Sequence, residues 1–174
     1  MAGHSVFGIF NSRQGVETAV AALKDADFRS SDISILAPEN LGDIRDIGTV
    51  KSTKAPEGAT TGGTSGAVLG GVFGWLVGIG ALAIPGVGPV LAAGPIMAAL
   101  AGVGVGATVG GLTGALIGFG LPEFEAKRYE TRLGKGGILL SVHADSHEWI
   151  TRAKTVLERS GAEEISTANE SKVA

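Results

Sequence analysis

The chain has 174 residues and no cysteine, which excludes disulfides, thiolate metal sites and cysteine nucleophiles. Its net charge of −3 and its pI of 5.6 argue against a nucleic-acid partner. Glycine supplies 29 residues without a period of three, so a collagen-like chain is also excluded. The first ten residues lack the basic start and long apolar run of a signal peptide, so we expect the N-terminal part to stay on the side of synthesis.

The first charged segment predicts a β-α-β unit. Ser5–Phe10 has the composition of a short strand, and Asn11 and Ser12 are suitable helix N-caps. The apolar residues of Val16–Phe28 recur at helical spacing. Asp32–Ala37 alternates apolar and polar residues, as a second strand would.

The middle of the chain carries glycines at a strict spacing of four. Residues 58–122 contain no Asp, Glu, Lys, Arg or His, and we expect helices over 62–84 and 96–120. A row of glycines lets two helix backbones approach closely, so this pattern is typical of helix–helix packing and self-association. The predicted oligomerisation residues are Gly62, Gly66, Gly70, Gly74, Gly78, Gly102, Gly106, Gly110, Gly114 and Gly118.

The expected helix lengths favour a bilayer. At about 1.5 Å per residue, each of the two helices exceeds the roughly 30 Å of the hydrocarbon core. The flanks of the insertion are basic and the connection between the helices is uncharged, so both termini are expected in the cytoplasm. The alternatives are a soluble, cytoplasmic oligomer that buries the hairpin in its own core, and a disordered insertion.

The last charged segment repeats the plan of the first. Glu123–Leu133 is expected to be a helix and Ile138–Val142 a strand. A second helix should begin after a cap at Asp145 or Ser146 and continue to Ser160, followed by an edge strand over Glu163–Thr167.

These elements predict an α+β fold. Residues 1–38 and 123–174 would form a split, ferredoxin-like βαβ-βαβ domain, with the two halves paired in one sheet. Residues 39–61 would be a linker, and residues 62–121 the inserted apolar glycine-zipper helical hairpin.

Few residues suggest chemistry. His143, Asp145, His147 and Glu148 carry ligand-type side chains, but a strand exit and a helix cap explain them better than a metal site does. Arg13 and Gln14 open a helix and are best explained as its solvated first turn rather than as an anion site. We therefore expect no catalytic residues, no metal and no cofactor, and hence no enzyme.

Short motifs along most of the chain resemble a known family. Val6–Ser12, Val20–Leu23 and Ile33–Leu36 resemble the heat-induced or general stress protein domain of bacteria. Further runs are similar to glycine-zipper-containing members of that family: Ile84–Pro95, Gly120–Glu123 with Ala126, Tyr129 and Glu130, and Gly136–Val142. The resemblance implies an association with bacterial stress and carries over no catalytic residues.

The sequence thus leads to two hypotheses of function. The first is a stress-associated structural protein that forms homo-oligomers through its zipper helices, embedded in the lipid bilayer of the cytoplasmic membrane. The alternative is a ligand- or metal-sensing α/β module in which the hairpin serves only as an anchor or as the oligomer core of a soluble assembly. A passive pore is a poorer explanation, because few hydroxyl side chains of the insertion could line a polar lumen.

Overall fold

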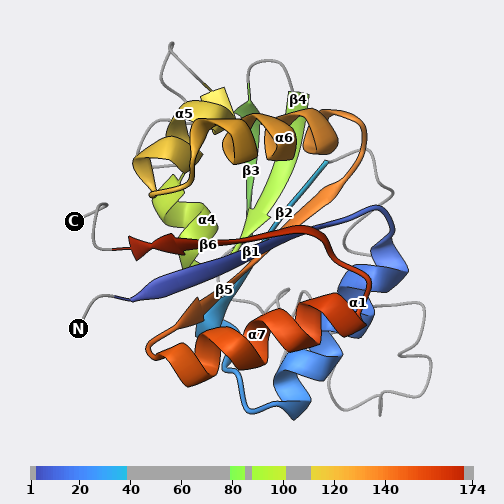
Figure 1. Ribbon diagram of the computed structural model, residues 1–174. Helices are drawn as coiled ribbons and strands as arrows, with labels where there is room; N and C mark the ends of the chain where they lie inside the picture. Colours follow the sequence, from blue (N-terminus) through green and yellow to red (C-terminus); the bar gives the residue numbers. More distant parts are fainter. Residues whose placement is uncertain (1–2, 39–78, 85–87, 101–110, 171–174) are drawn as a thin grey trace, which may run out of the picture.

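The computed structural model describes residues 3–38, 79–84, 88–100 and 111–170 (Figure 1). The strands are β1 (His4–Phe10), β2 (Ile33–Pro38), β3 (Ile79–Ile84), β4 (Gly88–Ala93), β5 (Ile138–Ala144) and β6 (Glu163–Asn169). The helices are α1 (Arg13–Asp25), the short 3-10 helix η1 (Ser30–Asp32), α4 (Pro95–Leu100), α5 (Gly111–Gly118), α6 (Glu123–Gly134) and α7 (His147–Arg159). The predicted α+β class is confirmed.

The strands form one six-stranded antiparallel sheet in the order β3-β4-β2-β5-β1-β6. Strand β5 lies between β2 and β1, so the two segments that flank the insertion share the sheet, as their matched patterns predict. Strands β3 and β4 pair with each other and extend the sheet beyond β2. The insertion therefore supplies one edge of the same sheet.

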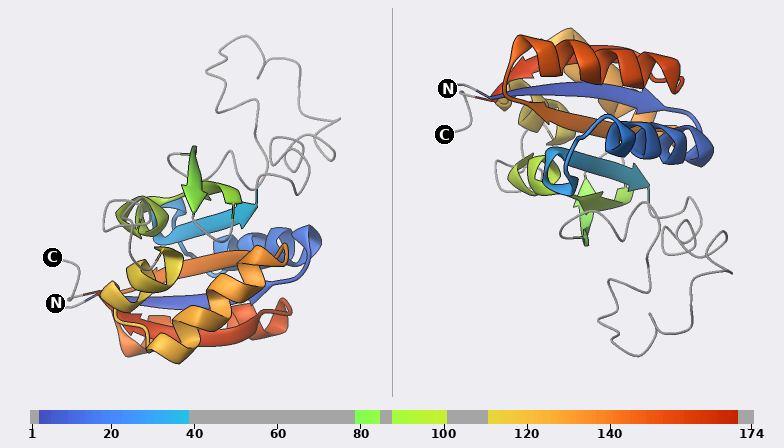
Figure 2. Two further views of the ribbon diagram at one scale, coloured as in Figure 1. Left: turned by 90° about the horizontal axis from the view of Figure 1, so that it is seen from above. Right: turned by 90° about the horizontal axis from the view of Figure 1, so that it is seen from below.

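Helices cover both faces of the sheet (Figure 2). Helices α1 and α7 lie on one face, and α4, α5 and α6 lie on the other. Alternate residues of a strand point to opposite faces. Leu140 and Val142 therefore join the first core, beneath α1 and α7, whereas Leu139 joins the second core, beneath α4, α5 and α6. The same alternation directs Ser141 and His143 toward the face that carries α4, α5 and α6.

Side-chain caps fix the starts of the two helices on the first face. The Ser12 hydroxyl accepts a hydrogen bond from the Gly15 amide at 3.1 Å, which confirms Ser12 as the N-cap of α1. Ser146 caps α7 in the same way, through the Trp149 amide at 3.4 Å. Each cap supplies a partner for an amide that the first helical turn leaves without one.

The predicted zipper hairpin is wrong where the structure describes it. Residues 79–84 were expected to end a helix, but they form β3, which pairs with β4 from Ile79↔Ala93 to Ile84↔Gly88. The first row of glycines at a spacing of four ends at Gly78, so it carries no information about the residues that follow. Gly88 and Pro89, which were expected to lie between two helices, belong to β4 instead, where they pair with Ile84 and Ala83.

The rest of the predicted hairpin is described only in part. Within the expected helix 96–120, the structure describes α4 and α5, and residues 101–110 lie outside the described residues. The predicted linker 39–61 and residues 62–78 lie outside them as well. In the described segments, no helix has the length and apolar character that crossing a membrane requires.

Candidate functional site

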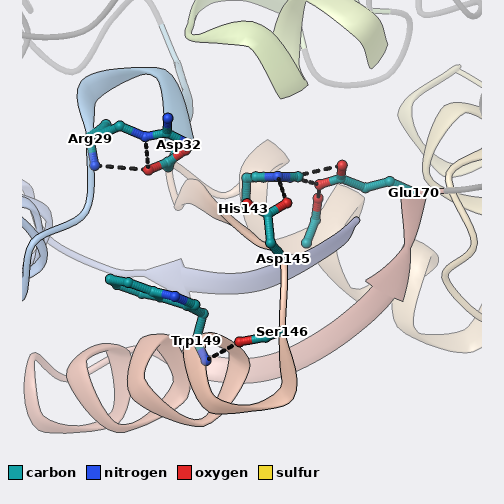
Figure 3. Close-up of polar contacts among 8 residues, drawn as sticks. Arg29, Asp32, His143, Asp145, Ser146, Trp149 and Glu170 are labelled. Atoms are coloured by element: carbon teal, nitrogen blue, oxygen red, sulfur yellow. Dashed lines mark hydrogen bonds and ion pairs between the residues drawn. The ribbon is translucent and has the colours of Figure 1, made fainter. Parts of the chain in front are cut away.

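Polar side chains from separate segments meet at one end of the sheet (Figure 3). His143 is the second-last residue of β5, and Asp145 is the first residue after that strand. Glu170 comes directly after β6, and Asp32 ends η1. The register brings these ends together, because His4 of β1 pairs with Ala144 on one side and Asn169 on the other.

The His143 ring lies between two carboxylates. Its Nδ1 is 2.8 Å and 2.9 Å from the two carboxylate oxygens of Glu170, and its Nε2 is 2.8 Å from Oδ1 of Asp145. A neutral imidazole has only one N–H, so the imidazolium alone can donate to both partners. Burial lowers the pKa of His143, but its hydrogen bonds and charge interactions with Glu170 and Asp145 outweigh burial and raise the pKa above its ordinary value.

The Glu170 carboxylate is held by more than His143. The buried Ser5 hydroxyl donates a hydrogen bond to it, and the Glu170 amide donates to the Gly3 carbonyl at 2.8 Å. A Cβ on Gly3 would lie 2.6 Å from both Glu170 Oε2 and His143 Cε1. Glycine therefore leaves the space in which the ring and the carboxylate meet.

Arg29 and Asp32 form a second polar pair beside His143. The Asp32 carboxylate accepts hydrogen bonds from the Arg29 amide at 2.9 Å, from Nε at 3.1 Å and from Nη2 at 3.0 Å. Asp32 is 8% exposed, so these bonds replace the water that its charge would otherwise bind. The hydrogen bond and charge of Asp32 raise the pKa of Arg29, whose side chain stays 71% exposed at the surface.

Two cavities flank this cluster, and Arg29, Asp32 and His143 line both of them. The first, of about 280 Å³, is also lined by Asp27, Phe28, Ala144, Asp145 and Trp149. The second, of about 410 Å³, is also lined by Ser31, Pro95, Ile96, Phe119 and Glu170. The Trp149 ring packs edge-on against Phe28 at 4.9 Å, and the Arg152 guanidinium lies 4.5 Å from its centre.

The cluster holds charges and a titratable proton. Among the described residues, no group of three or more His, Asp or Glu side chains could hold a metal ion. The Ser5 hydroxyl donates to a carboxylate and not to a histidine, so it is not activated as a nucleophile. The arrangement can therefore position side chains and respond to protonation.

The sequence identified only part of this cluster. Of the four residues with ligand-type side chains, His143 and Asp145 meet, with Nε2 and Oδ1 2.8 Å apart. His147 is the first residue of α7, and Glu148 pairs with Arg152 at 3.3 Å, so neither joins the cluster. At the other predicted helix start, Arg13 pairs with Glu17 within α1 at 3.6 Å.

Sequence reasoning missed Glu170, Arg29 and Asp32. Glu170 lies beyond the strand that was expected to end at Thr167, and only the register of β6 against β1 places it beside His143. The three-residue spacing of Arg29 and Asp32 is the signal that could have revealed their pair, because it is the spacing of a capping box.

Eight of the ten predicted oligomerisation glycines lie outside the described residues. They are Gly62, Gly66, Gly70, Gly74, Gly78, Gly102, Gly106 and Gly110. Gly114 and Gly118 lie on α5, where Gly114 is half-buried and Gly118 is exposed. Their contribution to an oligomer stays a prediction.

Comparison with protein families gives a match over residues 4–167, to the family described as the ActD subunit of alternative complex III. No curated protein and no solved structure matches the chain. The resemblance to the heat-induced or general stress protein domain is therefore wrong. It rested on short strand motifs and Gly-rich apolar runs, which recur in unrelated chains.

The match also corrects the functional hypothesis. A stress-associated protein that works by self-association through membrane-embedded zipper helices is not the family that the sequence fits. The named assembly has other subunits, so the expected homo-oligomer does not by itself describe the partners. The match spans nearly the whole chain, and the chain belongs to the family of ActD subunits of alternative complex III.

Proposed function

We propose that this chain is a non-catalytic subunit of alternative complex III, where it supports respiratory electron transfer by binding neighbouring subunits. The observation that carries the proposal is the family match over residues 4–167. The chemistry of the polar cluster supports it, because its groups hold charges in place and none of them is an activated nucleophile. Association with the membrane would then come through the rest of the complex.

In this proposal, the segments around the insertion act as a ferredoxin-like βαβ-βαβ frame. Their strands follow the order β2-β5-β1-β6, with α1 and α7 on one face. The insertion adds β3 and β4 to one edge and α4 and α5 to the opposite face. A frame with two filled cores keeps its shape, so it can present a fixed surface to a partner.

We further propose that the surface of α5 and α6 takes part in the contact. Phe124 is 69% exposed and Ile117 is 41% exposed, and they are the large exposed apolar side chains of the described residues. The Arg128 guanidinium lies 5.2 Å from the centre of the Phe124 ring. Aromatic residues and arginine are enriched where proteins bind each other, so this surface suits burial against another subunit.

The test is affinity capture of the tagged full-length chain from membranes dissolved in mild detergent. We expect the other subunits of alternative complex III to be recovered with it, at a ratio that stays constant across a sizing column. A chain that elutes without any of them would overturn the proposal. Electron-transfer activity in the chain purified alone would overturn the non-catalytic assignment.

The contact surface is tested by a matched pair of variants on α6. Phe124→Ser removes the exposed ring, and we expect it to lower the recovery of the complex severalfold. Lys127→Ser removes an ion pair with Glu123 at 2.7 Å, and because exposed ion pairs contribute little, recovery should stay near normal. Equal recovery of the two variants would reject this surface and leave membership of the complex unaffected.

A further inference from the structure

We propose that His143 is a proton-controlled latch at the rim of the two cavities. As the imidazolium it holds Asp145 and Glu170 together, and as the neutral ring it releases Asp145. This inference goes beyond the proposed function and depends only on the polar cluster described above (Figure 3).

The geometry requires one carboxylate to leave when the ring loses a proton. Both ring nitrogens lie 2.8 Å from a carboxylate oxygen, and a neutral ring can donate from only one of them. The other nitrogen would then present its lone pair to a negative charge at hydrogen-bond distance. That contact is repulsive, so the partner with the weaker attachment moves away.

Asp145 is the weaker partner. Its side chain is 66% exposed, and its carboxylate meets His143 through one oxygen. Glu170 is 22% exposed, contacts the ring through both oxygens, and is held further by Ser5 and the Gly3 carbonyl. The remaining proton therefore stays on Nδ1, and Nε2 faces Asp145 without a hydrogen.

The surrounding charges give the released carboxylate a destination. Arg29 lines both cavities with His143, and the charge of Asp145 already acts on its guanidinium. The other elements near the ring add two charged groups, Asp27 and Asp32, which precede β2. The remaining neighbours are uncharged: Pro95 and Ile96 on α4, Phe119 after α5, and Ser5 on β1. His4 of β1 is directed to the opposite face of the sheet. A free Asp145 side chain would turn toward Arg29.

The contact between His143 and Asp145 depends on pH through the pKa of the His143 ring. Its folded pKa lies above the ordinary value of about 6.5, so the contact with Asp145 is complete below that pH. It is lost as the pH rises through the folded pKa. The first cavity then changes shape, because Asp145 and Trp149 line it together.

Trp149 gives a direct optical readout of the latch. The chain has two tryptophans, so a Trp75→Phe background leaves Trp149 as the only indole. We expect its fluorescence to change sigmoidally with pH, with a midpoint above about 6.5. The midpoint should match the titration of the His143 ring followed by ¹⁵N NMR. His143→Gln should abolish the transition, whereas His147→Gln, at the start of the neighbouring helix, should keep it.

Further variants separate a latch from a merely structural histidine. Asp145→Asn keeps the ring and removes the charge that moves, so the fluorescence change should disappear while His143 still titrates at a lower pH. Glu170→Gln should lower the pH at which the His143 ring titrates, and by more than Asp145→Asn does. A transition that persists in His143→Gln, or a His143 ring that titrates at or below about 6.5, would overturn the proposal.

Discussion

Replacing Tyr129 by Phe tests how the second core is built. Tyr129 lies on α6 and is 1% exposed, and its ring centre lies 6.4 Å from that of Phe7. Its hydroxyl donates to the carbonyl of Glu164 and lies 3.4 Å from the carbonyl of Phe7. Loss of the hydroxyl leaves a carbonyl without this partner, which costs about 1–3 kcal/mol.

The effect is measured as a loss of stability in chemical and thermal unfolding. For a chain of this size, each kcal/mol lowers the melting temperature by about 2–4 °C. The control is Thr131→Val on the exposed side of the same helix, where the hydroxyl bonds only to the Lys127 carbonyl at 2.9 Å. That change should stay within about 0.5 kcal/mol.

Tyr129 also has its own spectroscopic signal, because it is the only tyrosine of the chain. Burial is the main cause that raises its pKa far above the ordinary value of about 10. The stability that the neutral hydroxyl contributes is therefore complete below about pH 10 and is lost as the pH rises toward the folded pKa. The stability difference between the native chain and Tyr129→Phe should shrink above pH 10.

Absorbance near 295 nm, where tyrosinate absorbs, follows this group directly. We expect the folded chain to show no tyrosinate up to the pH at which it unfolds, and the chain in guanidinium to titrate near pH 10. If Tyr129 titrates near pH 10 in the folded chain, its hydroxyl is open to water. That result would show that α6 does not bury Tyr129 against the sheet.

Three further substitutions test other parts of the fold by denaturant unfolding. Leu116→Ala empties a fully buried site and should lower the free energy of unfolding by about 2–5 kcal/mol. Ile117→Ala, at a position 41% exposed, should lower it far less. Equal losses of stability would contradict the assigned faces of α5. Ser12→Ala removes the N-cap of α1 and should cost about 1 kcal/mol, so an unchanged midpoint would reject the cap. Gly94→Ala places a Cβ 2.4 Å from Ser34 Oγ at a φ of +97°, and a stable, unperturbed variant would contradict this close approach.

The flanking segments could be predicted because their signals agree with one another. Helix α7 was expected from a cap at Asp145 or Ser146 to Ser160, and it spans His147–Arg159 behind the Ser146 cap. Its polar and apolar residues alternate with a helical period, so the buried face is defined by sequence alone. The pairing of the two segments also followed, since each would otherwise leave a sheet face bare.

The insertion could not be predicted in the same way, because it has no polar face. Residues 79–93 contain only Gly, Ala, Pro, Ile, Leu and Val, and such a run fits a buried helix as well as a buried strand. The pairing of β3 with β4, and of β4 with β2, decides between them. That information lies in the tertiary structure, and a glycine spacing that ends before residue 79 does not contain it.

The polar cluster could also be predicted only in part. The sequence singled out both His143 and Asp145, which are two residues apart at a strand exit, but their contact is known only from the structure. Glu170 reaches the ring because β1 lies between β5 and β6, an order that no local pattern encodes. The pair of Arg29 and Asp32 is local, and its three-residue spacing was overlooked because no helix was expected at η1.

The central claim, membership of alternative complex III, is tested most directly by capture through a different subunit. The complex is purified by a tag on one of its other subunits, and its peptides are quantified across a sizing column by mass spectrometry. We expect peptides of this chain to follow the complex at a constant ratio and to be lost from it only when the complex dissociates. An intact, active complex that lacks this chain, purified from cells that contain the chain, would show that the chain is not one of its subunits.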